Sequence, residues 1–381
     1  MPTPLAWLNL THDRRRLALA LAGVGFAVLL MCMELSFRQA LFDSTVEVIR
    51  QMNAELIITS RAQYTIVVRE TFSRRRVAQA EACPGVLAAY PLYLETHRSN
   101  LKNSETGEAV TIRVLAFNPD HPVFNMPEVE SHRSDLRLAD RVLFDRKSKP
   151  EYGHVTQGQS IELAGRSVDV VGLFTLGTDF ANDGNLMTSD ETYRRLFPVP
   201  GNDPLSAVDV GLVRLKSGQS LLDRQRDLQE LLPDDVVVLT KQEFEQRERW
   251  FWETSTPIGY IFWLGTLMGF IVGSVICHQI LYTDVADHLP EFATLKAMGY
   301  GNRYFVWLIM QEAVLLSLLG FVPGVACSQL ICYLVAMLTN LKVGVHLATA
   351  LTVLGMSIVM CIVSGCMTVR KVMELDPAEL F

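Results

Sequence analysis

The 381-residue sequence lacks the common signatures of catalysis. It contains no GxSxG nucleophile turn, no HExxH zinc pattern and no GxxxxGK(S/T) phosphate loop. The acidic loop around Gly184 does not meet the EF-hand spacing, and four histidines (His97, His121, His132 and His154) are scattered through polar segments, as solvated surface histidines are. We therefore expect a chain that is not an enzyme and that binds no metal or cofactor itself.

Cysteine is also scarce in the polar part of the chain, where acidic residues outnumber basic ones. Of seven cysteines only Cys83 lies between residues 38 and 253, so an intrachain disulfide is excluded there. The other six lie in apolar runs, where they are typical small packing residues. The same segment holds 26 basic and 32 acidic residues, and this balance argues against a nucleic-acid-binding protein.

Long apolar runs are what the sequence has in abundance. They cover residues 17–33, 257–281, 304–338 and 346–369. The first is preceded by three arginines and is longer than the roughly 7–15 apolar residues of a signal peptide, so we interpret it as a retained membrane helix. Aromatic residues mark the start of the second, as at a membrane interface: Trp250, Trp252, Tyr260 and Trp263.

The number of spans depends on the third run, which is interrupted at Pro323. As one helix it would be about 52 Å long, so it is either one long kinked helix or two spans. Four spans place residues 14–16 and the pair Arg370 and Lys371 on the same side, in the cytoplasm, as the positive-inside rule favours. The 38–253 segment is then outside the cytoplasm, and the loop 282–303 is inside.

The polar segment is expected to be a mixed α+β domain. Alternating patterns predict strands at 54–60, 86–96, 110–117, 141–144, 160–163, 168–173 and 236–239, and helices at 69–82 and 221–232. Segments 36–53 and 242–252 are predicted to be stalk helices that join it to the membrane. The expected organisation is residues 1–37 with the first span, 38–253 as the periplasmic domain, and 254–381 with spans two to four.

Two features inside the spans are candidates for helix packing. Gly265, Gly269 and Gly273 form a GxxxGxxxG series, which lets another helix backbone approach closely. The sequence leaves open whether that contact lies within one chain or between two. Glu312 is a carboxylate within the third run, where we expect a polar contact between helices rather than ion translocation.

The loop between spans two and three contains DHLPEFATLKAMGY. Pro290 suits a first helical turn, Asp287 is a candidate cap, and Gly299 is a candidate stop. Leu289, Phe292, Leu295 and Met298 would form its apolar side. The segment 287–299 is thus predicted to be a short helix at the inner membrane surface, suited to anchoring or to docking a cytoplasmic partner.

This helix resembles the E-I-x-x-L-(K/R)-A-(L/M)-G element of the permease family that includes FtsX, the Lol permeases and MacB. The matching segment is residues 291–299, and the ATPase-coupling residues that the resemblance implies are Glu291, Phe292, Thr294, Leu295, Lys296, Ala297, Met298 and Gly299. The chain's end is similar to the family's closing motif through Asp376, Pro377 and Glu379. LFTLGTDFANDGNL and LYTDVADHLPEFATLKAMGY resemble DevC-type ABC exporter permeases of cyanobacteria.

The resemblance implies a non-catalytic subunit of a tripartite ABC exporter in the inner membrane. ATP and magnesium would be used by a separate DevA-like ATPase, and a homodimer of permeases would work with a DevB-like periplasmic adaptor and a TolC-like channel. The implied cargo is an envelope lipid or glycolipid. The alternative that stays open is an FtsX-like regulator. It would transmit the movement of the ATPase to a periplasmic partner without transporting cargo.

Overall fold

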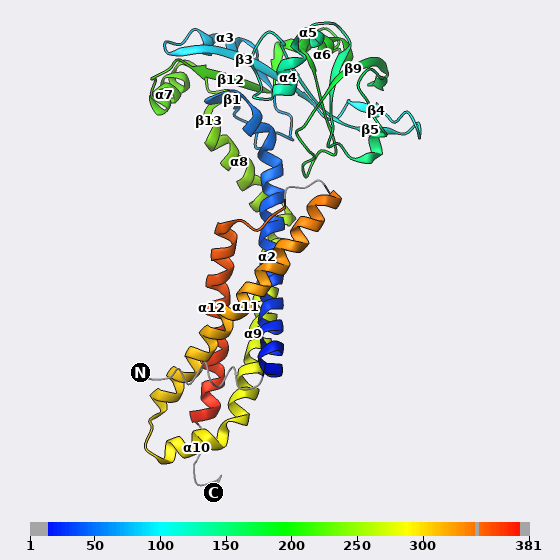
Figure 1. Ribbon diagram of the computed structural model, residues 1–381. Helices are drawn as coiled ribbons and strands as arrows, with labels where there is room; N and C mark the ends of the chain where they lie inside the picture. The colour runs from blue at the N-terminus through cyan, green and yellow to red at the C-terminus, as the bar shows by residue number, and fades with distance from the viewer. Residues whose placement is uncertain (1–13, 340–342, 374–381) are drawn as a thin grey trace. The chain divides into compact units, whose positions relative to one another are not determined.

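The computed structural model describes residues 14–339 and 343–373, and it contains two compact units. The soluble unit comprises Leu41–Thr256, and the membrane unit comprises the chain on both sides of it, up to Ala40 and from Pro257. Figure 1 shows the helices and strands of both. Within these described residues, four helices are long and apolar enough to span a membrane, as the sequence predicts.

The soluble unit is built on an eleven-stranded mixed sheet. Its strands, from one edge to the other, are β13 (Val236–Thr240), β1 (Leu56–Ser60), β12 (Val210–Leu215), β3 (Val86–Glu95), β6 (Arg113–Phe117), β10 (Asn185–Ser189), β7 (Arg141–Asp145), β9 (Arg166–Phe174), β8 (Ser160–Leu163), β4 (Asn100–Lys102) and β5 (Ala109–Thr111). The pairs β6–β10 and β7–β9 are parallel and the other pairs are antiparallel. A separate ribbon pairs β2 (Phe72–Ser73) with β11 (Ala207–Val208).

The sheet is buried on both faces, and its strands β1, β6 and β10 are buried at every position. In β1, Leu56 and Ile58 face one core and Ile57 faces the other. Helices α3 (Arg75–Glu81), α6 (Asp190–Leu196) and α7 (Leu221–Leu231) pack on the first core. The second core is covered by the end of α2 (Arg14–Gln51) and by α4 (Pro127–Ser131), α5 (Arg133–Leu136) and α8 (Lys241–Thr254).

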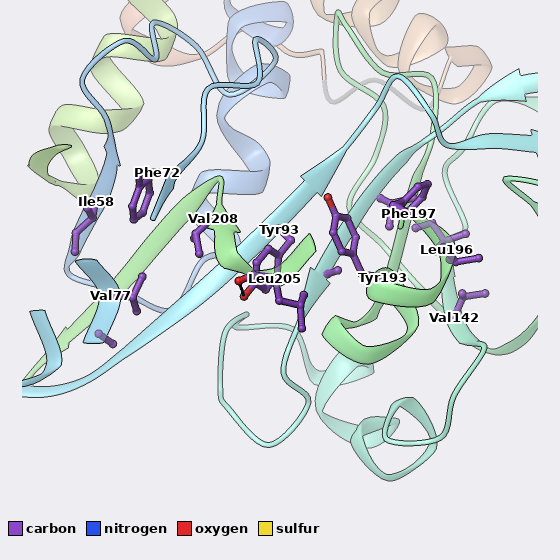
Figure 2. Packing of buried hydrophobic residues seen from close by; sticks show 14 of the residues in the cluster. Ile58, Phe72, Val77, Tyr93, Val142, Tyr193, Leu196, Phe197, Leu205 and Val208 are labelled. Carbon is purple, nitrogen blue, oxygen red and sulfur yellow. Dashed lines mark hydrogen bonds between the residues drawn. The ribbon is translucent and has the colours of Figure 1, made fainter. Parts of the chain in front are cut away.

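Figure 2 shows the first core around two stacked tyrosines. The rings of Tyr93 and Tyr193 have centroids 5.6 Å apart, and the Tyr93 hydroxyl donates to the Leu205 carbonyl oxygen at 3.1 Å. Burial of apolar surface contributes about 25 cal/mol per Å², so such clusters dominate the stability of the unit.

Several predicted boundaries are wrong. The helix expected at 69–82 begins only at Arg75, because residues 72–73 pair with β11. The strand expected at 110–117 is two strands, β5 and β6, with Ile112 between them. Strands β10 and β12 were not predicted, since each is a short run after a turn-rich loop whose pairing partners lie far away in the sequence.

The two predicted stalk helices meet inside the soluble unit. Helix α2 (Arg14–Gln51) continues for 38 residues, and its last part, from Leu41, packs beside α8. Asp43 pairs with Arg249 of α8. Lys241 Nζ donates to the carbonyl oxygens of Arg50, at 2.8 Å, and Met52, at 2.6 Å, and so satisfies acceptors at the α2 C-terminus.

The membrane unit consists of α2 together with α9 (Pro257–Asp287), α10 (Leu289–Ala297), α11 (Asn302–Thr339) and α12 (Leu347–Met373). Helix α11 is a single helix of 38 residues with Pro323 inside it, so the third apolar run is one span rather than two. Helix α12 packs against both α9 and α11.

Helix α2 crosses α11 where both carry glycine. An added Cβ at Gly324 would lie 2.7 Å from the backbone oxygen of Gly25, and one at Gly320 would lie 2.7 Å from the Val24 side chain. From the sequence, this Gly-rich stretch was predicted only to interrupt the third apolar run, residues 304–338. In the structure it is a GxxxG face at which two helix backbones approach closely.

We therefore expect Gly324→Ala to destabilise the membrane unit. The new methyl group meets backbone, which cannot move aside as a side chain can, so the expected cost is about 1–3 kcal/mol. Gly355→Ala on α12 is the matched control, because its Cβ would meet nothing within 4 Å. Thermal unfolding of the detergent-solubilised chain measures both, and equal melting temperatures for the two variants would contradict the packing argument.

Candidate functional site

The short helix α10 lies between α9 and α11, close to the predicted bounds. Pro290 occupies its first turn, where a missing N–H is harmless. The predicted cap is wrong: Asp287 is the last residue of α9, and His288 is the N-cap, without a side-chain capping bond. The His288 Nδ1 instead lies 3.2 Å from Glu291 Oε2, and Asp287 pairs with Arg16 at the start of α2.

One side of α10 is fixed by an aromatic and aliphatic cluster. Phe292 and Ala293 are buried, and Phe292 packs in one cluster with Val285 of α9 and Phe305 of α11. The rings of Phe292 and Phe305 meet edge to face, with centroids 5.5 Å apart. The buried side of the helix is therefore an anchor onto the membrane helices, and Leu295, which is half-buried, packs at its margin.

The opposite side of α10 is exposed. It carries Glu291, Thr294, Ala297 and Met298, which recur at the spacing of one helix face. The side chain of Met298, predicted on the apolar side, is 64% exposed, because this C-cap residue keeps a helical backbone and so lies on the face of Glu291, seven residues earlier. The predicted coupling residues therefore divide: Phe292 is buried, Leu295 and Lys296 are half-buried, and Glu291, Thr294, Ala297, Met298 and Gly299 are exposed.

The helix ends at Gly299, as predicted. This residue has φ of +99°, which glycine adopts without strain. Its N–H donates to the Lys296 oxygen and the Tyr300 N–H donates to the Leu295 oxygen, which together form a Schellman motif. The chain can thus turn sharply from α10 into α11.

The predicted glycine series on α9 packs within the chain. An added Cβ at Gly265 would collide with the Glu34 side chain of α2. One at Gly273 would lie 2.6 Å from the Ala27 Cβ, and Gly269 faces Met31. The groove is therefore occupied by α2 of the same molecule.

Two predictions remain, the intramembrane carboxylate Glu312 and the C-terminal motif, and the structure describes only the first. The Glu312 side chain is 1% exposed within the membrane unit. Its surroundings are therefore protein, as expected for a carboxylate in a span. Asp376, Pro377 and Glu379 lie outside the described residues.

Sequence reasoning missed a buried ionic cluster in the soluble unit. The Arg69 guanidinium donates to Asp209 and Glu95, both at 2.9 Å, and to the Tyr193 hydroxyl at 2.6 Å. Arg98 also donates to Glu95, at 2.6 Å. Burial raises the pKa of Asp209 to about 6, whereas hydrogen bonds from Arg98 and the charge of Arg69 outweigh burial and hold the pKa of Glu95 below its usual value.

The two carboxyl groups give opposite pH dependences. Because the folded pKa of Asp209 is raised, the folded state binds the proton more tightly, and stability falls as pH rises from 3.8 to about 6. The shifted pKa of Asp209 changes the free energy of unfolding over this pH range by on the order of 3 kcal/mol. The stability that Glu95 contributes is instead lost as pH falls below about 4.5.

We expect Asp209→Asn to flatten the fall in stability between pH 4 and 6. Denaturant unfolding of the full chain at a series of pH values measures this slope. Asp203→Asn, which removes a carboxyl group that accepts from the Leu205 N–H in the loop beside the cluster, is the control. If the stability of Asp209→Asn falls between pH 4 and 6 as much as that of the unchanged chain, the pH dependence does not come from Asp209.

Two family models cover most of the chain. The MacB-like periplasmic core domain matches residues 17–231, and the FtsX-like permease C-terminal domain matches residues 263–377. The second match includes α10, and the first includes the mixed sheet up to α7.

Curated relatives agree with these matches. An uncharacterized ABC transporter permease of Mycobacterium tuberculosis is 26% identical over 80% of this chain and 77% of its own length. An uncharacterized ABC transporter permease of Mycobacterium bovis is 24% identical over 97% of this chain and 96% of its own length. The macrolide export ATP-binding/permease protein MacB of Syntrophobacter fumaroxidans is 28% identical over 42% of this chain and 22% of its own length.

Among solved structures, the periplasmic region of MacB from Actinobacillus actinomycetemcomitans aligns with 52% of this chain and 94% of that one, at 12% identity and a TM-score of 0.37. The extracellular domain of the transporter YknZ from Gram-positive bacteria aligns at a TM-score of 0.34, with 12% identity, over 49% of this chain and 99% of its own. The family matches decide the assignment, since one of them alone covers more than half of the sequence. This chain belongs to the family of ABC transporter permeases that carry a MacB-like periplasmic core domain and an FtsX-like C-terminal region.

Proposed function

We propose that this chain is the permease subunit of a tripartite ABC exporter and that a separate ATPase docks on the exposed face of α10. The observation that carries the proposal is the division of α10 into two sides. Phe292 holds it to α9 and α11 and Ala293 is buried, while Glu291, Thr294 and Ala297 are exposed. A helix anchored on one side and open on the other can transmit the movement of a bound partner into the spans.

The stroke would reach the soluble unit through the stalk helices. Helix α2 begins at Arg14 in the membrane unit, and its last part contributes Val46 and Ile49 to a core of the sheet. Asp43 and Arg249 tie it to α8, which precedes the second span. ATP binding would close the partner ATPases, move α10, and shift the periplasmic domain, so that cargo is driven through an adaptor rather than through this chain's membrane helices.

A homodimer is part of the proposal, and its interface would not be the predicted glycine groove. Gly265, Gly269 and Gly273 already face α2 of the same chain. Two copies would meet through other lipid-facing surfaces of the bundle. Each copy would bind one DevA-like ATPase, which holds the ATP and magnesium.

The cargo and the other partners follow from the resemblance to DevC-type exporters. We propose an envelope lipid or glycolipid as cargo, a DevB-like adaptor and a TolC-like outer-membrane channel. The chain would lie in the inner membrane with both termini in the cytoplasm and the Leu41–Thr256 unit in the periplasm.

Purification of the tagged full-length chain after cross-linking in its host tests the proposal. We expect an ABC ATPase and a periplasmic adaptor in the same complex, and we expect a deletion strain to lose an envelope lipid or glycolipid from its outer membrane. Recovery of an activator of cell-wall hydrolases in place of the adaptor, with unchanged envelope lipids, would instead support the FtsX-like regulator. The absence of any ATPase from the complex would contradict both.

A further inference from the structure

A cavity of about 470 Å³ lies in the membrane unit, between the start of α2, the end of α9 and the first residue before α10. Figure 1 shows the start of α2, the end of α9 and the helix α10 towards the same end of the bundle. Its volume is within the range of ligand-binding sites, about 300–1,000 Å³. Neither the helix packing of α9 nor the exposed face of α10 uses it.

The lining of the cavity is divided by polarity. The polar side consists of Arg16, Thr283, Asp284, Asp287 and His288, and Gln279 lies deeper, next to Ile280. The apolar side includes Leu17, Ile276, Ile280 and Leu316. A site with a charged rim above an apolar floor suits a molecule that is itself amphiphilic.

The position of the rim along α9 corresponds to the lipid headgroups. Tyr260 marks one interface, and Leu281 is 21 residues further along the helix, about 32 Å away. Since the hydrocarbon core is about 30 Å thick, Asp284 and Asp287 lie just beyond it, at headgroup depth. Ile276 and Ile280 lie one to two turns deeper, at the depth of the acyl chains.

The charges of the rim select among headgroups. Asp284 and Asp287 are acceptors for an ammonium group, and Arg16 is a donor to a phosphate. Arg16 and Asp287 form an ion pair across the rim, so both signs of charge lie side by side. A zwitterionic headgroup with a phosphate next to an ammonium presents the complementary pair.

We propose that this cavity binds one phospholipid with a primary ammonium headgroup, of the phosphatidylethanolamine type, from the leaflet on the α10 side. The ammonium N–H groups donate to Asp284 and Asp287, the phosphate accepts from Arg16, and an acyl chain lies along Ile276, Ile280 and Leu316. The lipid is a structural ligand at the base of α2 and α9 and is distinct from the exported cargo.

Native mass spectrometry of the full-length chain in detergent tests the proposal, with phosphatidylethanolamine, phosphatidylcholine and phosphatidylglycerol added at equal concentration. All three carry a phosphate, but only the first offers ammonium N–H donors. We expect a single lipid adduct in which phosphatidylethanolamine is favoured at least about tenfold over phosphatidylcholine, as the loss of charge-assisted hydrogen bonds predicts.

The double variant Asp284→Asn, Asp287→Asn should lose this preference. Asp234→Asn in the soluble unit is the control, because its carboxylate is exposed and does not line the cavity. The preference is a ratio within one sample, so partial unfolding of a variant does not imitate its loss. Equal adducts of all three lipids on the unchanged chain would overturn the proposal, and so would a preference retained by the double variant.

Discussion

Ala297→Trp should abolish retention of the partner ATPase while leaving the permease folded. Ala297 is exposed on the open face of α10, at its last helical residue and three residues from Thr294, so an indole ring there occupies space that a docked partner needs. Loss of a central contact typically costs 2 kcal/mol or more, which corresponds to at least about a 30-fold weaker complex. Co-purification of the ATPase and its stimulated ATP hydrolysis measure the loss.

Leu351→Trp is the matched control for this result. It adds the same side chain at an exposed, lipid-facing position of α12, in the same unit but outside α10. We expect it to bind the ATPase normally and to melt at the same temperature as Ala297→Trp. Normal binding and hydrolysis in Ala297→Trp would show that the open face of α10 is not the docking surface.

A substitution of Leu295 would be a weaker test, although the family motif contains this residue. Leu295 is half-buried beside the cluster of Phe292 and Phe305. Its replacement would disturb the anchor of α10 as well as the docking face, and loss of binding would have two explanations. The exposed positions Glu291, Thr294 and Ala297 do not share this problem.

The membrane helices could be predicted because their signal is local. Each span is a single apolar run, and α10 is marked by Pro290 at its first turn and by Gly299 at its end. The face on which each residue lies was harder to predict. Met298 fits an apolar stripe through Leu295, three residues earlier, but it lies about 120° around the helix from the buried Phe292, and its side chain is exposed.

The parts that could not be predicted depend on long-range pairing. Strand β10 pairs with β6 and β7, and β12 pairs with β1 and β3, all from distant segments. Arg69 was assigned to a helix on local pattern, yet its partners Glu95 and Asp209 are 26 and 140 residues away. Likewise, the contact of Gly320 and Gly324 with α2 needs the crossing of two helices, which the sequence of one helix does not reveal.

The stalk helix α8 depends on one buried carboxylate, that of Glu248. Its Oε1 accepts from the Thr65 hydroxyl and, at 2.9 Å, from the Trp252 Nε1–H, and its Oε2 accepts from the Ile66 N–H, also at 2.9 Å. The side chain is fully buried, and burial raises its pKa. Glu248 thus fastens the loop that follows β1 to the helix that leads towards the second span.

Glu248→Ala should therefore destabilise the soluble unit by about 3–5 kcal/mol, because three buried donors lose their acceptor at once. For a domain of this size the expected fall in melting temperature is about 10 °C. Glu248→Gln keeps one carbonyl oxygen and should lose less than half as much. Gln246→Ala, at an exposed position of the same helix, should change stability by less than about 0.5 kcal/mol.

Thermal unfolding of the full chain, followed by tryptophan fluorescence, measures all three. Equal melting temperatures for Glu248→Ala and Gln246→Ala would show that the loop is held to α8 by its apolar contacts alone, and that the carboxylate contributes nothing to the attachment.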